Sequence, residues 1–180
     1  MVFIPRKTYY QIKKHLNKPE ISLIVGPRQA GKTTIMKKIE GDLKEKGQKT
    51  VFFNLDIIED KQFFTSQHTL IDQIKNQIGS KKAYVFIDEI HRLENAGLFL
   101  KGLYDMKTGH KFVVSGSGSL ELKSDLIEPM TGRKKTFHCL PLSFTEFAAF
   151  RFKSDFKDIA DFLKTNKQKR RRIVDEYLAY

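Results

Sequence analysis

A nine-residue stretch has the composition and spacing of a loop that binds phosphate. Its sequence, GPRQAGKTT, begins with the pattern G-x-x-x-x-G-K-[ST] and lies between an apolar run and a stretch of helical periodicity. Glycines let the backbone wrap around a phosphate, and successive N–H groups at a helix start point toward it. We therefore predict that a nucleotide binds to Gly26, Pro27, Arg28, Gln29, Ala30, Gly31, Lys32, Thr33 and Thr34.

Side chains within this loop have separate expected roles. The ammonium of Lys32 is expected to reach the β- and γ-phosphates, and the hydroxyl of Thr33 is expected to bind Mg²⁺. Arg28 either contacts phosphate or a partner, or faces solvent. The structural alternative for the whole loop is a strand-to-helix turn without a ligand.

Two adjacent carboxylates follow a second apolar run, at residues 84–87. Because Mg²⁺ prefers one or two carboxylates and several waters, Asp88 is a predicted metal ligand beside Thr33. Glu89 is predicted to orient and polarise an attacking water, which favours hydrolysis over transfer to a small-molecule acceptor. The structural alternative for this pair is an acidic helix cap or a surface turn.

Small polar residues follow a third apolar run, at residues 112–114. The hydroxyl of Ser115 or Ser117 could lie between the phosphate loop and the acidic pair and contact the γ-phosphate or the attacking water. The alternative for either residue is a glycine and serine turn. A dinucleotide-binding fingerprint is excluded here, because Gly116 and Gly118 are not followed by the third glycine of that pattern.

The elements that must position these residues alternate along the chain. Short, continuous apolar runs predict strands, and apolar residues at helical spacing predict the helices between them. This alternation predicts an α/β domain with a largely parallel sheet, covered by helices on both faces and binding ligands beyond the carboxyl ends of its strands. The predicted strands are 21–25, 51–55, 84–87, 112–114 and 136–140, and the predicted helices are 32–46, 60–78, 96–106 and several after 143.

Composition narrows the function classes further. The 180 residues contain no apolar run long enough to cross a bilayer and a single cysteine, Cys139, which excludes an intrachain disulfide and favours a cytoplasmic protein without a membrane contact. Lys and Arg number 33 against 21 Asp and Glu, a net charge of +12 that suggests polyanion partners, including nucleic acid. Six of the positive charges lie within 164–172, where the alternative is a solvated helix face.

Taken together, the motifs resemble the archaeal and bacterial AAA-type ATPase family, whose members are often fused to a C-terminal domain of unknown function. The resemblance extends over nearly the whole chain, and its most specific parts are the "GR" and "PLSF-x-EF" segments. The segments that carry it are 26–34, 86–91, 115–117, 131–133 and 140–147.

This resemblance implies a P-loop NTPase three-layer sandwich of the AAA-like, additional-strand type, with a further strand between those that carry the phosphate loop and Asp88. It implies an ATPase that uses ATP and Mg²⁺, with a core at 1–150 and a basic helical tail at 151–180 that begins a downstream region. Arg133 matches the family's GR arginine, which could neutralise γ-phosphate charge in its own subunit or in a neighbour's within a homo-oligomer. A salt-bridging or backbone-binding arginine is the alternative.

Other readings remain open at this point. The chain could be a nucleotide-gated switch with little turnover, or a nucleic-acid-associated ATPase; a small-molecule kinase is disfavoured by Glu89. The segment from Ile4 to Tyr10 could fold over adenine, or it could form a helix that packs on the sheet through Tyr9, Ile12 and Leu16.

Overall fold

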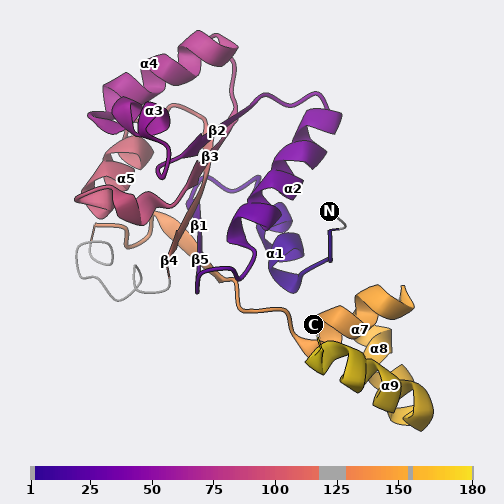
Figure 1. Cartoon of the computed structure of the whole chain (residues 1–180). Helices are drawn as coiled ribbons and strands as arrows, with labels where there is room; N and C mark the ends of the chain where they lie inside the picture. Colours follow the sequence, from indigo (N-terminus) through magenta and orange to yellow (C-terminus); the bar gives the residue numbers. More distant parts are fainter. Residues whose placement is uncertain (1–2, 118–128, 154–155, 180) are drawn as a thin grey trace.

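A parallel sheet forms the centre of the molecule. The computed structural model describes residues 3–117, 129–153 and 156–179. Within these residues five strands pair in the order β2-β3-β4-β1-β5, and each pairing is parallel (Figure 1). The predicted additional strand is therefore confirmed, because β4 lies between β1 and β3. The strands are β1 (Ile21–Gly26), β2 (Thr50–Asn54), β3 (Tyr84–Asp88), β4 (Lys111–Ser117) and β5 (Lys134–His138).

Helices cover both faces of the sheet, as the alternating pattern predicts. Figure 1 shows α1 and α2 on one face and α3, α4 and α5 on the other. The result is the expected three-layer α/β sandwich. The helices are α1 (Lys7–His15), α2 (Lys32–Glu45), α3 (Ile58–Lys61), α4 (Gln67–Ile78), α5 (Ala96–Asp105), α7 (Phe144–Phe152), α8 (Phe156–Thr165) and α9 (Lys167–Leu178), with short 3₁₀ turns η1 (Gln62–Phe64) and η2 (Ile90–Arg92).

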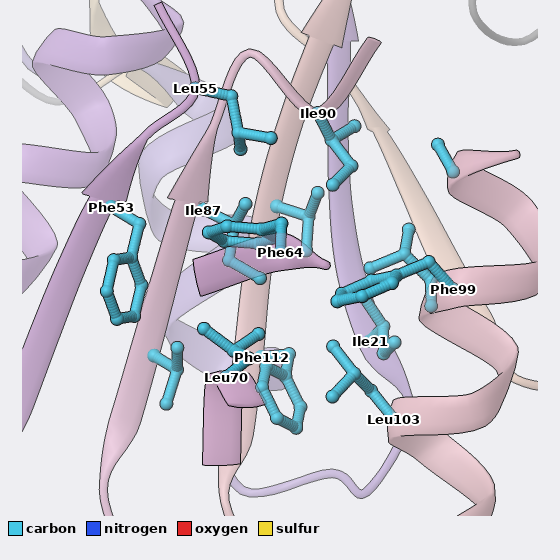
Figure 2. Packing of buried hydrophobic residues seen from close by; sticks show 14 of the residues in the cluster. Ile21, Phe53, Leu55, Phe64, Leu70, Ile87, Ile90, Phe99, Leu103 and Phe112 are labelled. Carbon is cyan, nitrogen blue, oxygen red and sulfur yellow. The ribbon is translucent and has the colours of Figure 1, made fainter. Parts of the chain in front are cut away.

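The central strands are continuous apolar runs because both of their faces are buried. Leu23 and Val25 of β1 belong to the core that packs under α4 and α5, whereas Ile24 between them belongs to the core under α1 and α2. Figure 2 shows the first of these cores, in which Phe64 and Phe99 lie over the sheet. Their ring centroids are 5.6 Å apart.

Two predicted elements differ from the structure in their bounds. The segment 60–78 is not one helix, because Ser66 begins a new helix: its hydroxyl accepts a hydrogen bond from the backbone N–H of Thr69. The fifth strand occupies 134–138 instead of 136–140. The chain leaves the sheet there, and the carbonyl of Leu140 accepts a hydrogen bond from the Arg6 side chain.

The helices after β5 pack mainly on one another. Figure 1 shows α7, α8 and α9 grouped together at a distance from the sheet. The division of the chain at residue 150 remains a prediction, and α7 spans that position. Within the described ranges, no helix is both long and apolar enough to cross a membrane. The buried residues shared by these three helices are Phe147, Ala148, Ala149, Ile159, Leu163 and Ile173.

A buried arginine connects the helical group to the sheet. The Arg6 guanidinium donates to the carboxylate of Glu146 in α7 at 3.0 Å, to the carbonyl of Ala30 at 3.3 Å and to the carbonyl of Leu140 at 2.5 Å. Ala30 lies in the loop between β1 and α2. One side chain therefore holds together the N-terminal segment, this loop, the exit from β5 and the start of α7.

Glu146 completes this connection. Its carboxylate accepts hydrogen bonds from the backbone N–H groups of Lys7 and Ser143, and with Ser143 it forms the capping box of α7. Burial raises the pKa of Glu146, but these N–H groups and the Arg6 charge outweigh it and lower the pKa below its usual value. Because the folded-state pKa is lowered, this carboxylate stabilises the fold above its unfolded pKa. That contribution is lost as the pH falls through the folded value.

We predict that Arg6→Ala lowers the free energy of unfolding by about 3 kcal/mol, because it leaves a buried carboxylate without its cation. The matched control is Arg92→Ala, since Arg92 pairs with Asp56 at 2.7 Å but both side chains are nearly half exposed. That control is expected to lose less than about 1 kcal/mol. Chemical denaturation of both variants measures the difference, and equal losses would contradict a special role for the buried pair.

Candidate functional site

The predicted phosphate loop joins β1 to α2 at the carboxyl edge of the sheet. Its backbone requires glycine at two positions. Gly31 has a φ of +90°, which L side chains rarely adopt, and a Cβ on Gly26 would lie 2.0 Å from the carbonyl oxygen of Cys139. The glycines of the motif therefore serve two separate needs, a left-handed turn and a close approach to the chain that leaves β5.

Lys32 is buried, with 5 % of its surface exposed. Its ammonium donates hydrogen bonds to the carbonyl oxygens of Gly26 at 3.1 Å and Pro27 at 2.9 Å. These bonds hold the positive charge against the loop. The other predicted loop side chains differ in their exposure to solvent: Arg28 and Thr34 are exposed, whereas Ala30 is buried.

The structure brings Thr33, Asp88 and Ser115 together. The Thr33 hydroxyl donates to Oδ2 of Asp88 at 2.6 Å, and the Ser115 hydroxyl donates to Oδ1 of the same carboxylate. Asp88 is 1 % exposed and Ser115 is fully buried. A carboxylate and a hydroxyl at the mouth of a phosphate loop are hard oxygen donors, and they fit the preferences of Mg²⁺.

Ser115 also supports the second carboxylate. Its Oγ accepts a hydrogen bond of 3.2 Å from the backbone N–H of Glu89. In this structure Ser115 therefore orients both members of the acidic pair. Ser117, the other predicted sensor, lies at the end of β4 opposite Gly26, so its backbone is next to the phosphate loop.

Glu89 lies in a turn between β3 and η2, with a left-handed backbone at φ 59° and ψ 41°. This conformation is unfavourable for a residue other than glycine. The Glu89 carboxylate lies 3.0 Å from Nδ1 of His91, a close contact without hydrogen-bond geometry. Burial lowers the pKa of His91, and the Glu89 charge opposes that shift. The sequence indicates no role for His91, and its proximity to Glu89 follows from the left-handed turn.

Arg133 does not reach the phosphate loop of its own chain. It precedes β5 and lies beside Ile21, whose N–H donates to the Arg133 carbonyl at 2.9 Å, so it occupies the amino edge of the sheet. The length of β1, about 17 Å, separates that edge from the loop. The Arg133 guanidinium instead pairs with Asp105 at the end of α5, at 2.9 Å. A role on the γ-phosphate of its own subunit is thus corrected to the salt-bridging alternative.

A cavity of about 500 Å³ lies beside the phosphate loop. Its lining residues come from the N-terminal segment, the phosphate loop, the first turn of α2, the connection to α7, and α9. The packed-helix alternative for the N-terminal segment is confirmed, because α1 packs on the sheet through Tyr9, Ile12 and Leu16, while residues before it line the cavity. The lining includes Phe3, Ile4, Gly31, Thr34, Leu142 and Tyr177.

Two parts of this site were not expected from the sequence. The buried pair of Arg6 and Glu146 joins residues 140 positions apart, and Tyr177 reaches the cavity from the last helix. The PLSF-x-EF segment, which contains Glu146, was the available signal, but its partner could not be identified without the fold.

We predict that Gly26→Ala displaces the loop and abolishes detectable nucleotide binding, because the added Cβ would collide with the Cys139 carbonyl. Gly41→Ala is the matched control. Gly41 lies inside α2 with open space around it, so the same substitution is expected to stabilise the fold by about 0.5–1 kcal/mol. Titration calorimetry and thermal unfolding measure both effects, and full nucleotide affinity in Gly26→Ala would refute the close approach.

Comparisons with known proteins bear on the family and the fold of this chain. An uncharacterized protein of Methanocaldococcus jannaschii, MJ1544, is 28% identical over 133 residues, which are 73% of this chain and 29% of that protein. The chain therefore spans less than a third of the length of this curated relative. Among solved structures, Drosophila ORC bound to DNA has 13% identity and a TM-score of 0.51, over 75% of this chain and 89% of that one. Its similarity supports the fold alone.

A second solved structure, the Pif1 helicase from Candida albicans, has 11% identity and a TM-score of 0.49, over 81% of this chain and 42% of that one. A family model described as an AAA domain matches residues 18–148. This match includes the phosphate loop, the acidic pair and β4, and it extends over well more than half of the sequence. The chain therefore belongs to the AAA domain family.

Proposed function

We propose that this protein binds ATP with Mg²⁺ and hydrolyses it to ADP and phosphate. The observation that carries the proposal is the contact of the Thr33 hydroxyl with the buried Asp88 carboxylate at 2.6 Å, directly beside the phosphate loop. Family membership supports nucleotide binding and ATPase chemistry in general. The arrangement of these residues supports the more specific assignment.

The proposed division of labour follows from position. The loop N–H groups and Lys32 bind the phosphates, while Thr33 and Asp88 hold Mg²⁺, which when bound neutralises phosphate charge. Glu89 orients the attacking water, and Ser115 fixes the backbone N–H of Glu89 together with the Asp88 carboxylate. We assign none of these residues as a covalent nucleophile, so the chemistry rests on positioning and charge.

The cavity beside the loop is the proposed site for the base. Its walls are largely apolar and aromatic, which suits a flat ring, and it adjoins the first turn of α2, where the phosphates are expected to end. Phe3 and Ile4 line it from the N-terminal segment, and Leu142 and Tyr177 from the connection to α7 and from α9. The preference for adenine rests on the family.

A nucleotide-gated switch is the second candidate. Tyr177 of α9 lines the same cavity as Gly31 of the loop, so a bound base would contact the C-terminal helices and the loop together. The position of Arg133 also favours slow turnover by a single chain, since it leaves the γ-phosphate without this arginine. An Arg133 supplied by a neighbouring subunit remains a proposal and requires a homo-oligomer.

We also propose a cytoplasmic location. The single cysteine, Cys139, is buried, and burial raises the pKa of its thiol, so it is held in the unreactive protonated form. A lone protected thiol is typical of proteins from reducing compartments.

Lys32→Ala is expected to weaken Mg·ATP binding about 10- to 100-fold, because it removes the charge-assisted hydrogen bonds to the phosphates. Lys37→Ala is the control, since Lys37 is an exposed lysine of the same helix. Titration calorimetry of Mg·ATP into the three proteins provides the measurement. Absence of binding by the folded unsubstituted chain would overturn the proposal.

Glu89→Gln is expected to keep Mg·ATP affinity within about threefold while turnover falls roughly 10²- to 10⁴-fold, because the amide cannot polarise water as the carboxylate does. Phosphate release under saturating ATP separates the two candidate functions. Turnover that is low in the unsubstituted chain and unchanged in Glu89→Gln would favour the switch over the hydrolase.

A further inference from the structure

The amino edge of the sheet is lined with lysine. Because every pairing is parallel, the starts of the strands meet at one edge, and the phosphate loop lies at the other. Each strand begins at or within a few residues of a lysine. These residues are Lys18 before β1, Lys49 before β2, Lys82 before β3, Lys111 at the start of β4 and Lys134 at the start of β5.

A groove of about 650 Å³ runs along this edge. Four lysines line it, namely Lys18, Lys82, Lys107 and Lys111, and no carboxylate is among its lining residues. Lys18, Lys82 and Lys107 are exposed, and within the described ranges none of the three forms an ion pair. We refer to this feature as the lysine groove.

Lys111 builds the floor of the lysine groove. It is buried, and its ammonium donates to the carbonyl of Lys18 at 3.0 Å and to the carbonyl of Glu20. These bonds hold the segment before β1 against β4. Burial lowers the pKa of Lys111 to about 8. Burial lowers the pKa of His15, the charges of Lys111, Lys135 and Lys18 lower it further, and the nearby Glu20 carboxylate opposes them.

Aromatic side chains lie in the same groove. Tyr84 packs with the core under α2 and Tyr104 with the core under α5, so the two partly exposed rings line the groove from opposite faces of the sheet. A positively charged groove with aromatic rings is the arrangement that binds single-stranded nucleic acid, because phosphates contact the lysines and bases stack on the rings.

A protein partner fits this surface less well. Protein interfaces usually contain an apolar centre. The aliphatic and phenylalanine side chains that line the groove, Leu16, Leu103 and Phe112, are buried in the described structure and offer little apolar surface to such a partner. The basic residues of α8 and α9 are a weaker candidate for nucleic acid, since Lys164 pairs with Asp161 in α8 and Arg172 with Glu176 in α9.

We propose that the lysine groove binds a short stretch of single-stranded nucleic acid, with phosphates at Lys18, Lys82 and Lys107 and bases stacked on Tyr84 and Tyr104. This site is separate from the phosphate loop and lies at the opposite edge of the sheet. The inference does not rest on ATP hydrolysis, because binding is measured without nucleotide or Mg²⁺.

The test is fluorescence anisotropy of a labelled ten-nucleotide oligothymidylate with the full chain at a series of salt concentrations. Three lysine contacts predict a slope of about −2.1 for log K against log[salt], which is a roughly 20-fold loss of affinity between 50 and 200 mM. No binding at the lowest salt would overturn the proposal, as would complete displacement of the oligonucleotide by Mg·ATP.

Two pairs of variants locate the site. Lys82→Gln with Lys107→Gln is expected to reduce the slope to about −0.7, because one of the three lysine contacts remains. Lys167→Gln with Arg171→Gln in α9 removes the same charge and is expected to leave the slope unchanged. If the α9 pair lowers the slope and the groove pair does not, the basic tail is the binding surface and the proposal is wrong.

A further variant tests the role of stacking. Tyr104→Leu is expected to weaken oligonucleotide binding about tenfold without changing the salt slope, because base–aromatic stacking is sensitive to the ring and not to ionic strength. Thermal unfolding of each variant establishes that it is folded. Equal affinity for a duplex or for polyglutamate of similar charge would show attraction by charge alone and would reject the nucleic-acid site.

Discussion

The buried carboxylate of Asp88 joins three elements at the carboxyl edge of the sheet. A charge that is removed from water must be satisfied by hydrogen bonds, and here the hydroxyls of Thr33 and Ser115 provide them. Thr33 comes from the first turn of α2 and Ser115 from β4. The placement of β4 between β1 and β3 is therefore what brings the phosphate loop and the acidic pair to a shared site.

The rest of the structure is connected to this site through Arg6 and Glu146. The phosphate loop is held from one side by the sheet and from the other by Arg6, which also contacts the start of α7. Any movement of the carbonyl of Ala30 is thus felt at the C-terminal helices. The cavity that we assign to the base is lined by the phosphate loop and by α9. Binding of a base there would therefore contact both the loop and the C-terminal helices.

Local signals in the sequence were sufficient for much of the fold and for the centre of the site. The phosphate loop, Asp88 and Glu89 were predictable because each follows an apolar run whose parallel pairing places its carboxyl end at one edge. The break at Ser66 was not, since helical periodicity continues across it. The choice among the alternatives for Arg133 could not be made from the sequence, because a motif does not reveal which edge of the sheet its residue occupies. The pairing of Arg6 with Glu146 depends on tertiary structure and has no local signature.

The register of β4 also constrains how the chain can change in length. Val113 and Val114 lie opposite Phe86 and Ile87, which sets Ser115 against Asp88. Adding or removing one residue within β4 would turn every following side chain to the opposite face, so Ser115 would leave the acidic pair and Val114 or Gly116 would take its place. The turn at Gly47 has open space around it and carries no such contacts. Relatives of this chain are therefore expected to vary in length at that turn and to keep the length of β4 constant.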